Sequence, residues 1–131
     1  MSSLKNSTTI LSLLAVLILV PNVLDAQGTR LLRQPTISAD YIAFAYGGDI
    51  WRANLDGSEV RRITSTPAVE SDPHFSPDGN WLAFTSNRSG ANAVYVVSKE
   101  GGIPERLTWH TSTTGVRGWT PDGQHILYAS T

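Results

Sequence analysis

The chain has no cysteine and only one methionine among its 131 residues. Without cysteine it forms no disulfide, carries no thiol nucleophile and offers no thiolate ligand to a metal ion. The chain also lacks an excess of either charge, because ten Lys and Arg residues are balanced by eleven Asp and Glu residues, for a formal net charge of −1. With neither a basic stripe nor an acidic tail, composition gives no support for a nucleic-acid partner or an anionic membrane surface.

Long apolar runs are scarce, and the main one lies near the N-terminus at residues 10–20. Lys5 is the only charged residue before Asp25, and a small residue, Ala26, follows the polar stretch after the run. A basic start, a short apolar core and a small residue at the cut are typical of a secretory signal peptide. Eleven helical residues cover about 16 Å, roughly half of a bilayer core, so a stable membrane anchor is the weaker interpretation. The sequence predicts a signal peptide over residues 1–26 and export to the periplasm or medium.

The rest of the chain repeats itself. The tetrad SPDG at residues 76–79 returns as TPDG at residues 120–123, and a weaker copy, SAD, occupies residues 38–40. In a second register, residues 49–57 match residues 93–101, and RIT at 62–64 matches RLT at 106–108. Repeats of about 40–45 residues with several short strands each are typical of a β-propeller, in which each repeat forms one blade.

We therefore predict an all-β fold, a partial β-propeller of two full four-stranded blades and a truncated third, over residues 27–131. The repeats are expected at about residues 35–71, 72–115 and 116–131. The expected strands of the second repeat lie at residues 72–75, 81–85, 93–97 and 105–108. Those of the first lie at residues 36–38, 41–46, 49–55 and 60–64, and the third repeat supplies 116–119 and 124–130. No window after residue 26 has sustained helical spacing.

Few residues suggest chemistry. The three histidines, His74, His110 and His125, hold non-equivalent places in their repeats and form no ligand-spaced motif, so a structural role is the favoured interpretation. Asp78 and Asp122 resemble a carboxylate pair, but each lies in a Pro-Asp-Gly turn and is expected to cap the backbone there.

Other polar and aromatic residues have a functional and a structural interpretation. Ser76 precedes a proline and lacks a nucleophile-elbow motif. Core packing is expected for Trp51 and Trp81, whereas a surface role stays open for Trp109 and Trp119. Arg61, Arg62 and Arg106 could bind a carboxylate or phosphate, but solvated charge on an edge strand is the preferred interpretation. Asn87-Arg88-Ser89 has the sequence of an N-glycosylation site. No glycine-rich phosphate loop is present. Taken with the interpretations above, the sequence predicts no catalytic residue, no metal site and no cofactor.

Residues 69–79 (VESDPHFSPDG), with VYVV at 94–97 and residues 101–108, resemble the WD40-like PD40 repeat of TolB and of tricorn proteases. The joined tryptophan motifs at residues 106–110 (RLTWH) and 116–123 (VRGWTPDG), together with LLRQPTIS at 31–38, resemble the opening propeller of tricorn-type serine proteases. The resemblance covers roughly residues 29–131.

This resemblance implies a larger parent protein with a serine peptidase region, to which no residue of this sequence corresponds. It also implies that the completed propeller guides peptide or protein substrates. The first hypothesis is therefore the propeller of an exported tricorn-like serine peptidase. The alternative is a non-enzymatic, TolB-like periplasmic propeller that binds proteins through its loops. Taken alone, residues 27–131 are expected to self-associate through uncovered blade faces.

Overall fold

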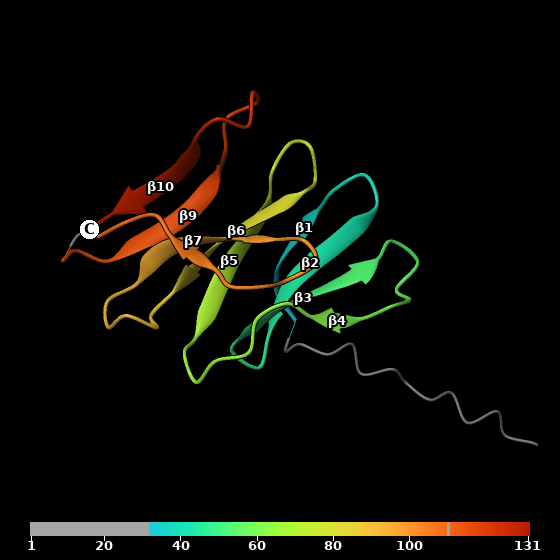
Figure 1. Ribbon diagram of the computed structural model, residues 1–131, viewed down its shortest axis with the longest axis horizontal. Coiled ribbons are helices and arrows are strands. Elements are labelled where there is room, and N and C mark those ends of the chain that lie inside the picture. The colour runs from blue at the N-terminus through green and yellow to red at the C-terminus, as the bar shows by residue number, and fades with distance from the viewer. Residues whose placement is uncertain (1–31, 110) are drawn as a thin grey trace, which may run out of the picture.

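The computed structural model describes residues 32–109 and 111–131, and the strands in these ranges form three separate antiparallel sheets (Figure 1). The first sheet contains β1 (Arg33–Ile37), β2 (Tyr41–Tyr46), β3 (Asp49–Asn54) and β4 (Arg61–Arg62). The second contains β5 (Glu70–Phe75), β6 (Trp81–Ser86), β7 (Ala93–Ser98) and β8 (Glu105–Arg106). The third contains β9 (Thr114–Trp119) and β10 (Ile126–Ser130). No helix occurs in these two ranges.

The sheets have the meander order of propeller blades. Each strand of the four-stranded sheets pairs with the next in sequence, in the orders β1-β2-β3-β4 and β5-β6-β7-β8. The first strands lie next to one another, β1 beside β5 and β5 beside β9, and the sheets fan out from them (Figure 1). The predicted fold class, an all-β partial propeller with two four-stranded blades and a two-stranded third, is confirmed.

The Pro-Asp-Gly tetrads form the turns that join the first two strands of a sheet. At residues 76–79 the Gly79 amide donates to the Ser76 carbonyl at 2.8 Å. Gly79 has a φ of +70°, a left-handed conformation that favours glycine. Its Cα also lies so close to the preceding sheet that an added Cβ would come within 3.2 Å of the Ser38 Cβ. The last glycine of the tetrad therefore serves both the turn and the approach of two sheets.

The repeated Arg-x-Thr motif follows the outer strands β4 and β8. The Thr64 hydroxyl accepts the Ile50 amide at 2.9 Å, and the Thr108 hydroxyl accepts the Val94 amide at the same distance. The two arginines fold back in the same way, Arg62 Nε donating to the Thr64 carbonyl and Arg106 Nε to the Thr108 carbonyl. The threonine of the motif, which follows the end of the fourth strand, thus satisfies a buried amide near the start of the third strand.

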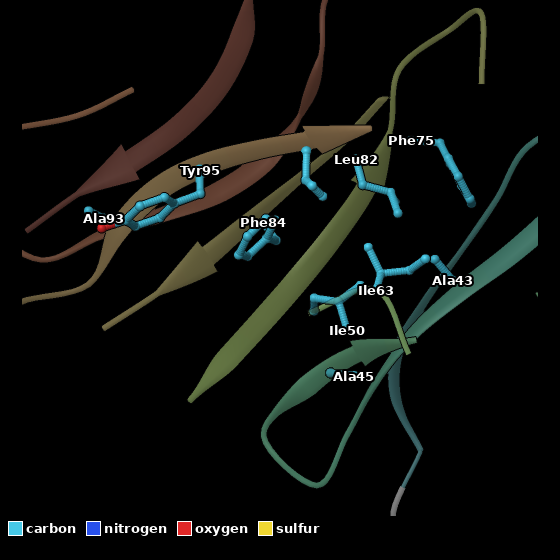
Figure 2. Close-up of a cluster of buried hydrophobic side chains, with 10 residues drawn as sticks. Ala43, Ala45, Ile50, Ile63, Phe75, Leu82, Phe84, Ala93 and Tyr95 are labelled. Atoms are coloured by element: carbon cyan, nitrogen blue, oxygen red, sulfur yellow. The ribbon is translucent and has the colours of Figure 1, made fainter. Parts of the chain in front are cut away.

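Two apolar clusters hold the sheets together. The larger lies between the first and second sheets, where Ile50 and Ile63 face Leu82 and Phe84 (Figure 2). Phe84 stacks on Tyr95 with ring centroids 5.9 Å apart. The smaller cluster lies between the second and third sheets and contains Ala83, Val94 and Val116, with Trp119 and Ile126 packed against it. Because the residues of β6 from position 82 onward are all buried, this strand is covered on both faces, as its apolar run predicted.

Some expected boundaries were wrong. The outer strands β4 and β8 have two residues each, since the threonines expected to end them leave the ladder to bind an amide instead. Conversely, β5 begins at Glu70, two residues earlier than expected. The proposed signal peptide at residues 1–26 lies outside the described residues. In the described part of the chain, no helix has the length and apolar character needed to cross a membrane.

Candidate functional site

The first strands of the three sheets present polar side chains along the line where the sheets meet. We call this surface the inner-strand wall and define it by Gln34 of β1, Asp72 and His74 of β5, and Arg117 of β9. Gln34 and Arg117 are exposed, and Asp72 and His74 are half-buried. The wall therefore combines an amide, a carboxylate, an imidazole and a guanidinium on neighbouring strands.

Bulges in the first strands shape the wall. The register of β1 against β2 shifts between Arg33 and Thr36, and that of β5 against β6 shifts between Ser71 and His74. Within these bulges Gln34 and Asp72 take left-handed φ angles of 53° and 51°. A proline follows each of them, and proline is tolerated at a bulge because it has no amide to contribute to the ladder. The bulges withdraw these residues from regular pairing and free their side chains and amides for contacts between sheets.

Side chains of one sheet satisfy the bulge amides of the next. Gln34 Oε1 accepts the Asp72 amide at 3.0 Å while Gln34 Nε2 donates to Asp72 Oδ1 at 2.6 Å. Asp72 Oδ2 accepts the Thr85 hydroxyl at 3.2 Å, and the Thr85 Oγ1 accepts the Val116 amide at 3.0 Å. A continuous chain of hydrogen bonds therefore links all three sheets. Sequence reasoning missed Gln34 and Thr85, although the equivalent repeat positions of Gln34 and Asp72 were a usable signal.

The space between the first and second sheets contains a cavity of about 420 Å³ next to the wall. Gln34 lines it together with Arg33, Ala45, Val69 and Glu70. Glu70 is only 2% exposed. Sequence reasoning also missed this buried carboxylate, because nothing in the repeat pattern distinguishes it from a surface glutamate.

The two described histidines, His74 and His125, have separate hydrogen-bond partners. His74 lies on β5, with Nδ1 3.0 Å from the Asp72 carbonyl, and its own carbonyl accepts the Trp119 indole N–H at 3.0 Å. His125 is exposed before β10, and its amide donates to the Thr120 hydroxyl at 3.0 Å. His110 lies outside the described residues.

The turn carboxylates act on their own backbones. Asp78 Oδ1 accepts the Ser76 hydroxyl at 2.5 Å and the Asn80 amide at 3.0 Å. The hydrogen bond from Ser76 is the main reason why the pKa of Asp78 lies below its ordinary value. Thr120 likewise lowers the pKa of Asp122. The predicted capping role is confirmed. The Ser76 hydroxyl donates to Asp78 and accepts the Trp81 amide.

The exposure of Trp81 differs from expectation. Trp81 was expected in the core but is 48% exposed, because it is the first residue of β6 and lines an open groove with Trp119, Asp78 and Asp122. Trp51 is half-buried and packs edge-on against Tyr46. Trp119 packs against the smaller core cluster, whereas Trp109 is 70% exposed.

Two of the three arginines expected as solvated edge charge, Arg61 and Arg62, make ion pairs. Arg62 binds Asp49 at 2.6 Å, and Arg61 binds Glu100 of the second sheet at 3.0 Å. Glu100 also pairs with the buried Arg52 at 2.9 Å. The ion pairs made by Glu100 link neighbouring sheets. Arg61 and Arg62 therefore have a structural role, as ion-pair partners on the edge strand.

At the glycosylation sequon, Asn87 Oδ1 accepts the Val69 amide at 2.8 Å. Among residues 32–109 and 111–131, no three His, Asp or Glu side chains gather as a metal site would require. The arrangement offers polar and charged contacts along the inner-strand wall and a cavity beside it. Both suit the binding of a polar chain or a small molecule.

Comparison with known proteins agrees with this architecture. A family model described as the tricorn protease N-terminal beta propeller domain matches residues 29–131. Tricorn protease homolog 1 of Streptomyces coelicolor is 43% identical over 101 residues, which are 76% of this chain and 9% of the relative. The Tol-Pal system protein TolB of Bordetella pertussis is 46% identical over 46 residues, 35% of this chain and 10% of that protein.

Among solved structures, the crystal structure of the tricorn protease superposes with a TM-score of 0.63 and 30% identity, covering 71% of this chain and 10% of that chain. In each of these three comparisons, the matched part of the chain spans about a tenth of the length of the other protein.

Proposed function

The chain belongs to the tricorn protease N-terminal beta propeller family, and we propose that it is the substrate-guiding propeller region of an exported tricorn-like serine peptidase. In this proposal, peptide-bond hydrolysis takes place in another part of a longer protein. The match of the family model over residues 29–131 carries the proposal. The inner-strand wall supports it, because the exposed guanidinium of Arg117 can form transient hydrogen bonds with the backbone carbonyls of a passing peptide.

The first test is genetic. The reading frame downstream of the codon for Thr131 should encode further propeller repeats and a peptidase region with a serine nucleophile. A frame that encodes a closed propeller and no peptidase region would instead favour the TolB-like binding protein. The similarity to TolB over 46 residues supports that second function.

The second test is enzymatic. In a longer protein that contains this segment and hydrolyses peptides, we expect Arg117→Glu to lower kcat/KM for long peptides and to leave the cleavage of a short fluorogenic peptide unchanged. The reason is that a guiding surface contacts the part of a substrate that lies away from the scissile bond. Arg61→Glu, on the outer strand β4, is the matched charge reversal and should change neither value. Equal losses on long and short substrates would contradict a guiding role for the wall.

Residues 27–131, purified alone, are expected to have no peptidase activity against casein or short fluorogenic peptides. The described residues bring no histidine to a serine or carboxylate partner in a catalytic arrangement. Turnover that copurifies with this segment and disappears in His74→Ala, His110→Ala or His125→Ala would contradict this expectation.

Export rests on the pattern of residues 1–26. We expect the mature protein to begin at Gln27 and to be found outside the cytoplasm. N-terminal sequencing of protein recovered from the periplasm or medium checks this, and exported material that begins at Met1 would contradict it.

A further inference from the structure

Two Pro-Asp-Gly turns form an open groove at one end of the second and third sheets. The turns at residues 76–79 and 120–123 lie at the same end of the molecule (Figure 1), and the groove that they line measures about 550 Å³. The turns are also neighbours, because an added Cβ at Gly123 would lie 3.6 Å from Pro77 Cδ. The lining of the groove includes two tryptophans and two aspartates: Trp81, Trp119, Asp78 and Asp122.

The groove carries negative charge that its own lining does not balance. Hydrogen bonds from Ser76 and Thr120 hold the pKa of Asp78 and of Asp122 below the ordinary value, so both carboxylates are ionised at neutral pH. Neither forms an ion pair within the described part of the chain. No lysine, arginine or histidine is among the described residues that line the groove. The charge of the groove is therefore complementary to a cation.

The first sheet shows what an aromatic ring binds at this place in the repeat. Tyr41 is the first residue of β2, as Trp81 is of β6, and each pairs with the last residue of the third strand of its sheet. The Arg52 guanidinium carbon lies 4.0 Å from the centroid of the Tyr41 ring, and Lys99 Nζ lies 5.5 Å from it. Glu100 pairs with the same arginine at 2.9 Å. An aromatic ring and a carboxylate thus hold cations between the first and second sheets.

The second sheet has no cation of its own at this place. In the first sheet Arg52 lies opposite Ala43, whereas in the second sheet the residue opposite the equivalent Ala83 is Val96. Valine brings no charge to the ring, and no cation of the described residues lies over the Trp81 ring. Trp81 is accordingly 48% exposed. The substitution of valine for arginine leaves an aromatic face and two carboxylates to a cation from outside the sheet.

We propose that this groove binds an arginine or lysine side chain of a partner polypeptide, with the cation against the Trp81 ring and beside Asp78 and Asp122. Tryptophan attracts a cation over its face more strongly than the other aromatic side chains do. The carboxylates can accept charged hydrogen bonds from a guanidinium or ammonium group. Pro77 and Pro121, which also line the groove, suit the aliphatic stem of such a side chain. The groove is therefore an interaction surface for a basic segment.

Saturation-transfer difference NMR on the 131-residue chain tests the proposal, since it reports weak binding for monomers and oligomers alike. The probes are N-acetyl-glycyl-L-arginyl-glycinamide and the same peptide with citrulline, which replaces the guanidinium by a neutral group of nearly the same shape. We expect saturation transfer to the arginine side chain and binding of the citrulline probe that is weaker by at least about threefold, as the loss of an exposed cation–π contact and ion pair implies. Equal binding of the two probes, or no binding of either, would overturn the proposal.

Two variants with matched controls locate the site. Trp81→Leu should weaken binding of the arginine probe by about threefold or more, whereas Trp109→Leu should not, because Trp109 is exposed but does not line the groove. Asp122→Asn should also weaken binding and keeps an oxygen that can cap the turn. Asp56→Asn is its control, since Asp56 caps a turn through Ser58 away from the groove. Unchanged binding by Trp81→Leu or by Asp122→Asn would place the cation elsewhere and overturn the proposal.

Two further readouts complete the test. If circular dichroism shows that a variant does not fold, the probe pair on the unmodified chain decides. If the groove holds a basic side chain of a second copy instead, the arginine probe does not bind at high protein concentration, and Trp81→Leu shifts the sedimenting species towards monomer. That result would overturn the assignment to a separate partner. None of these readouts depends on peptidase activity, so the binding proposal and the peptidase proposal can fail separately.

Discussion

At the scale of single residues, hydroxyl–carboxylate pairs hold the turns of this propeller together. Hydrogen bonds lower the pKa of Asp56, Asp78 and Asp122, led in each case by a bond from Ser58, Ser76 or Thr120. A carboxylate whose pKa is lower in the folded than in the unfolded state stabilises the fold above its unfolded pKa. That stability is lost as the pH falls through the folded pKa. These side chains are exposed, so each one contributes a small part of the effect.

We predict that the melting temperature of the chain falls as the pH is lowered from about 5 towards 3, and that Asp78→Asn makes this fall shallower. The amide of asparagine does not titrate, so its share of the acid sensitivity disappears. Differential scanning fluorimetry across this pH range measures the slope. Asp40→Asn is the control, because Asp40 lies in the equivalent turn of the first repeat, where the turn bonds in the described part of the chain are made by Ser38 instead. Equal slopes for Asp78→Asn and the unmodified chain would contradict the prediction.

Residue roles were predictable where they follow from the backbone and not where they depend on a neighbouring sheet. The capping role of Asp78 follows from its Pro-Asp-Gly context, which is local. The exposure of Trp81 depends on whether the next sheet covers the end of β6, and the strand pattern does not contain that information. The burial of the Glu70 carboxylate likewise depends on donors from different segments, which no linear motif encodes.

At the scale of elements, the Arg-x-Thr motif makes a specific prediction about stability. Thr64→Val keeps the shape of the side chain but removes the hydroxyl that accepts the buried Ile50 amide. We expect the free energy of unfolding to fall by about 1–3 kcal/mol, because the amide stays buried without a partner. Urea denaturation followed by tryptophan fluorescence measures this. Thr113→Val, at an exposed position, should change stability by less than about 0.5 kcal/mol. Similar losses in both variants would show that valine, not the missing acceptor, is responsible.

Two glycines that follow an aspartate in a turn allow a paired test. Gly79→Ala and Gly57→Ala both place a side chain at a left-handed φ, +70° and +83°. Only at Gly79 does the new Cβ meet another atom, the Ser38 Cβ at 3.2 Å, whereas at Gly57 it meets nothing within 4 Å. We expect Gly57→Ala to cost about 1–2 kcal/mol from backbone strain alone and Gly79→Ala to cost clearly more. Differential scanning fluorimetry compares the two, and equal losses of melting temperature would mean that the two sheets do not approach as closely as described.

The strands were predictable from spacing, and the bulges were not. Apolar runs and turn signals at fixed intervals were enough to place β2, β6 and β7 within a residue or two. The bulges at Gln34 and Asp72 go together with hydrogen bonds between these two residues across the sheets, and the pattern of a single strand does not contain such a contact. The sequence marks the places only indirectly, through the proline that follows each of them.

At the scale of the whole molecule, each sheet is stabilised by the sheet next to it. The larger core cluster exists only where the first and second sheets face each other, and the hydrogen-bond chain from Gln34 to Val116 crosses both boundaries. This explains why the repeat length predicted the architecture: a repeat of this kind cannot bury its faces alone. The same dependence also defines the weak point of the chain.

The third sheet is that weak point, and it leads to the last prediction. Within the described ranges β10 pairs with β9 and with no other strand, and its Leu127 is 51% exposed. A groove of about 410 Å³ beside it is lined by Val96, Leu107 and Ile126. Burial of an apolar side chain contributes roughly 1.5–3 kcal/mol, against a typical domain stability of about 5–15 kcal/mol. Pairing of β10 with the edge of a second copy would therefore recover a substantial part of the stability of this fold.

We predict that residues 27–131, taken alone, associate in a concentration-dependent manner in sedimentation velocity experiments, and that Leu127→Lys shifts them towards monomer. A charged side chain on an edge strand opposes pairing with another chain, because it would be buried at the new contact. Ile103→Lys is the control, since Ile103 is 97% exposed but lies in the turn between β7 and β8, away from the open edge. If exposed apolar area in general drove association, both variants would reduce it equally. If the unmodified chain sediments as a monomer at every concentration, the open edge of β10 is not an interaction surface, and the two-stranded sheet is stable without a neighbour.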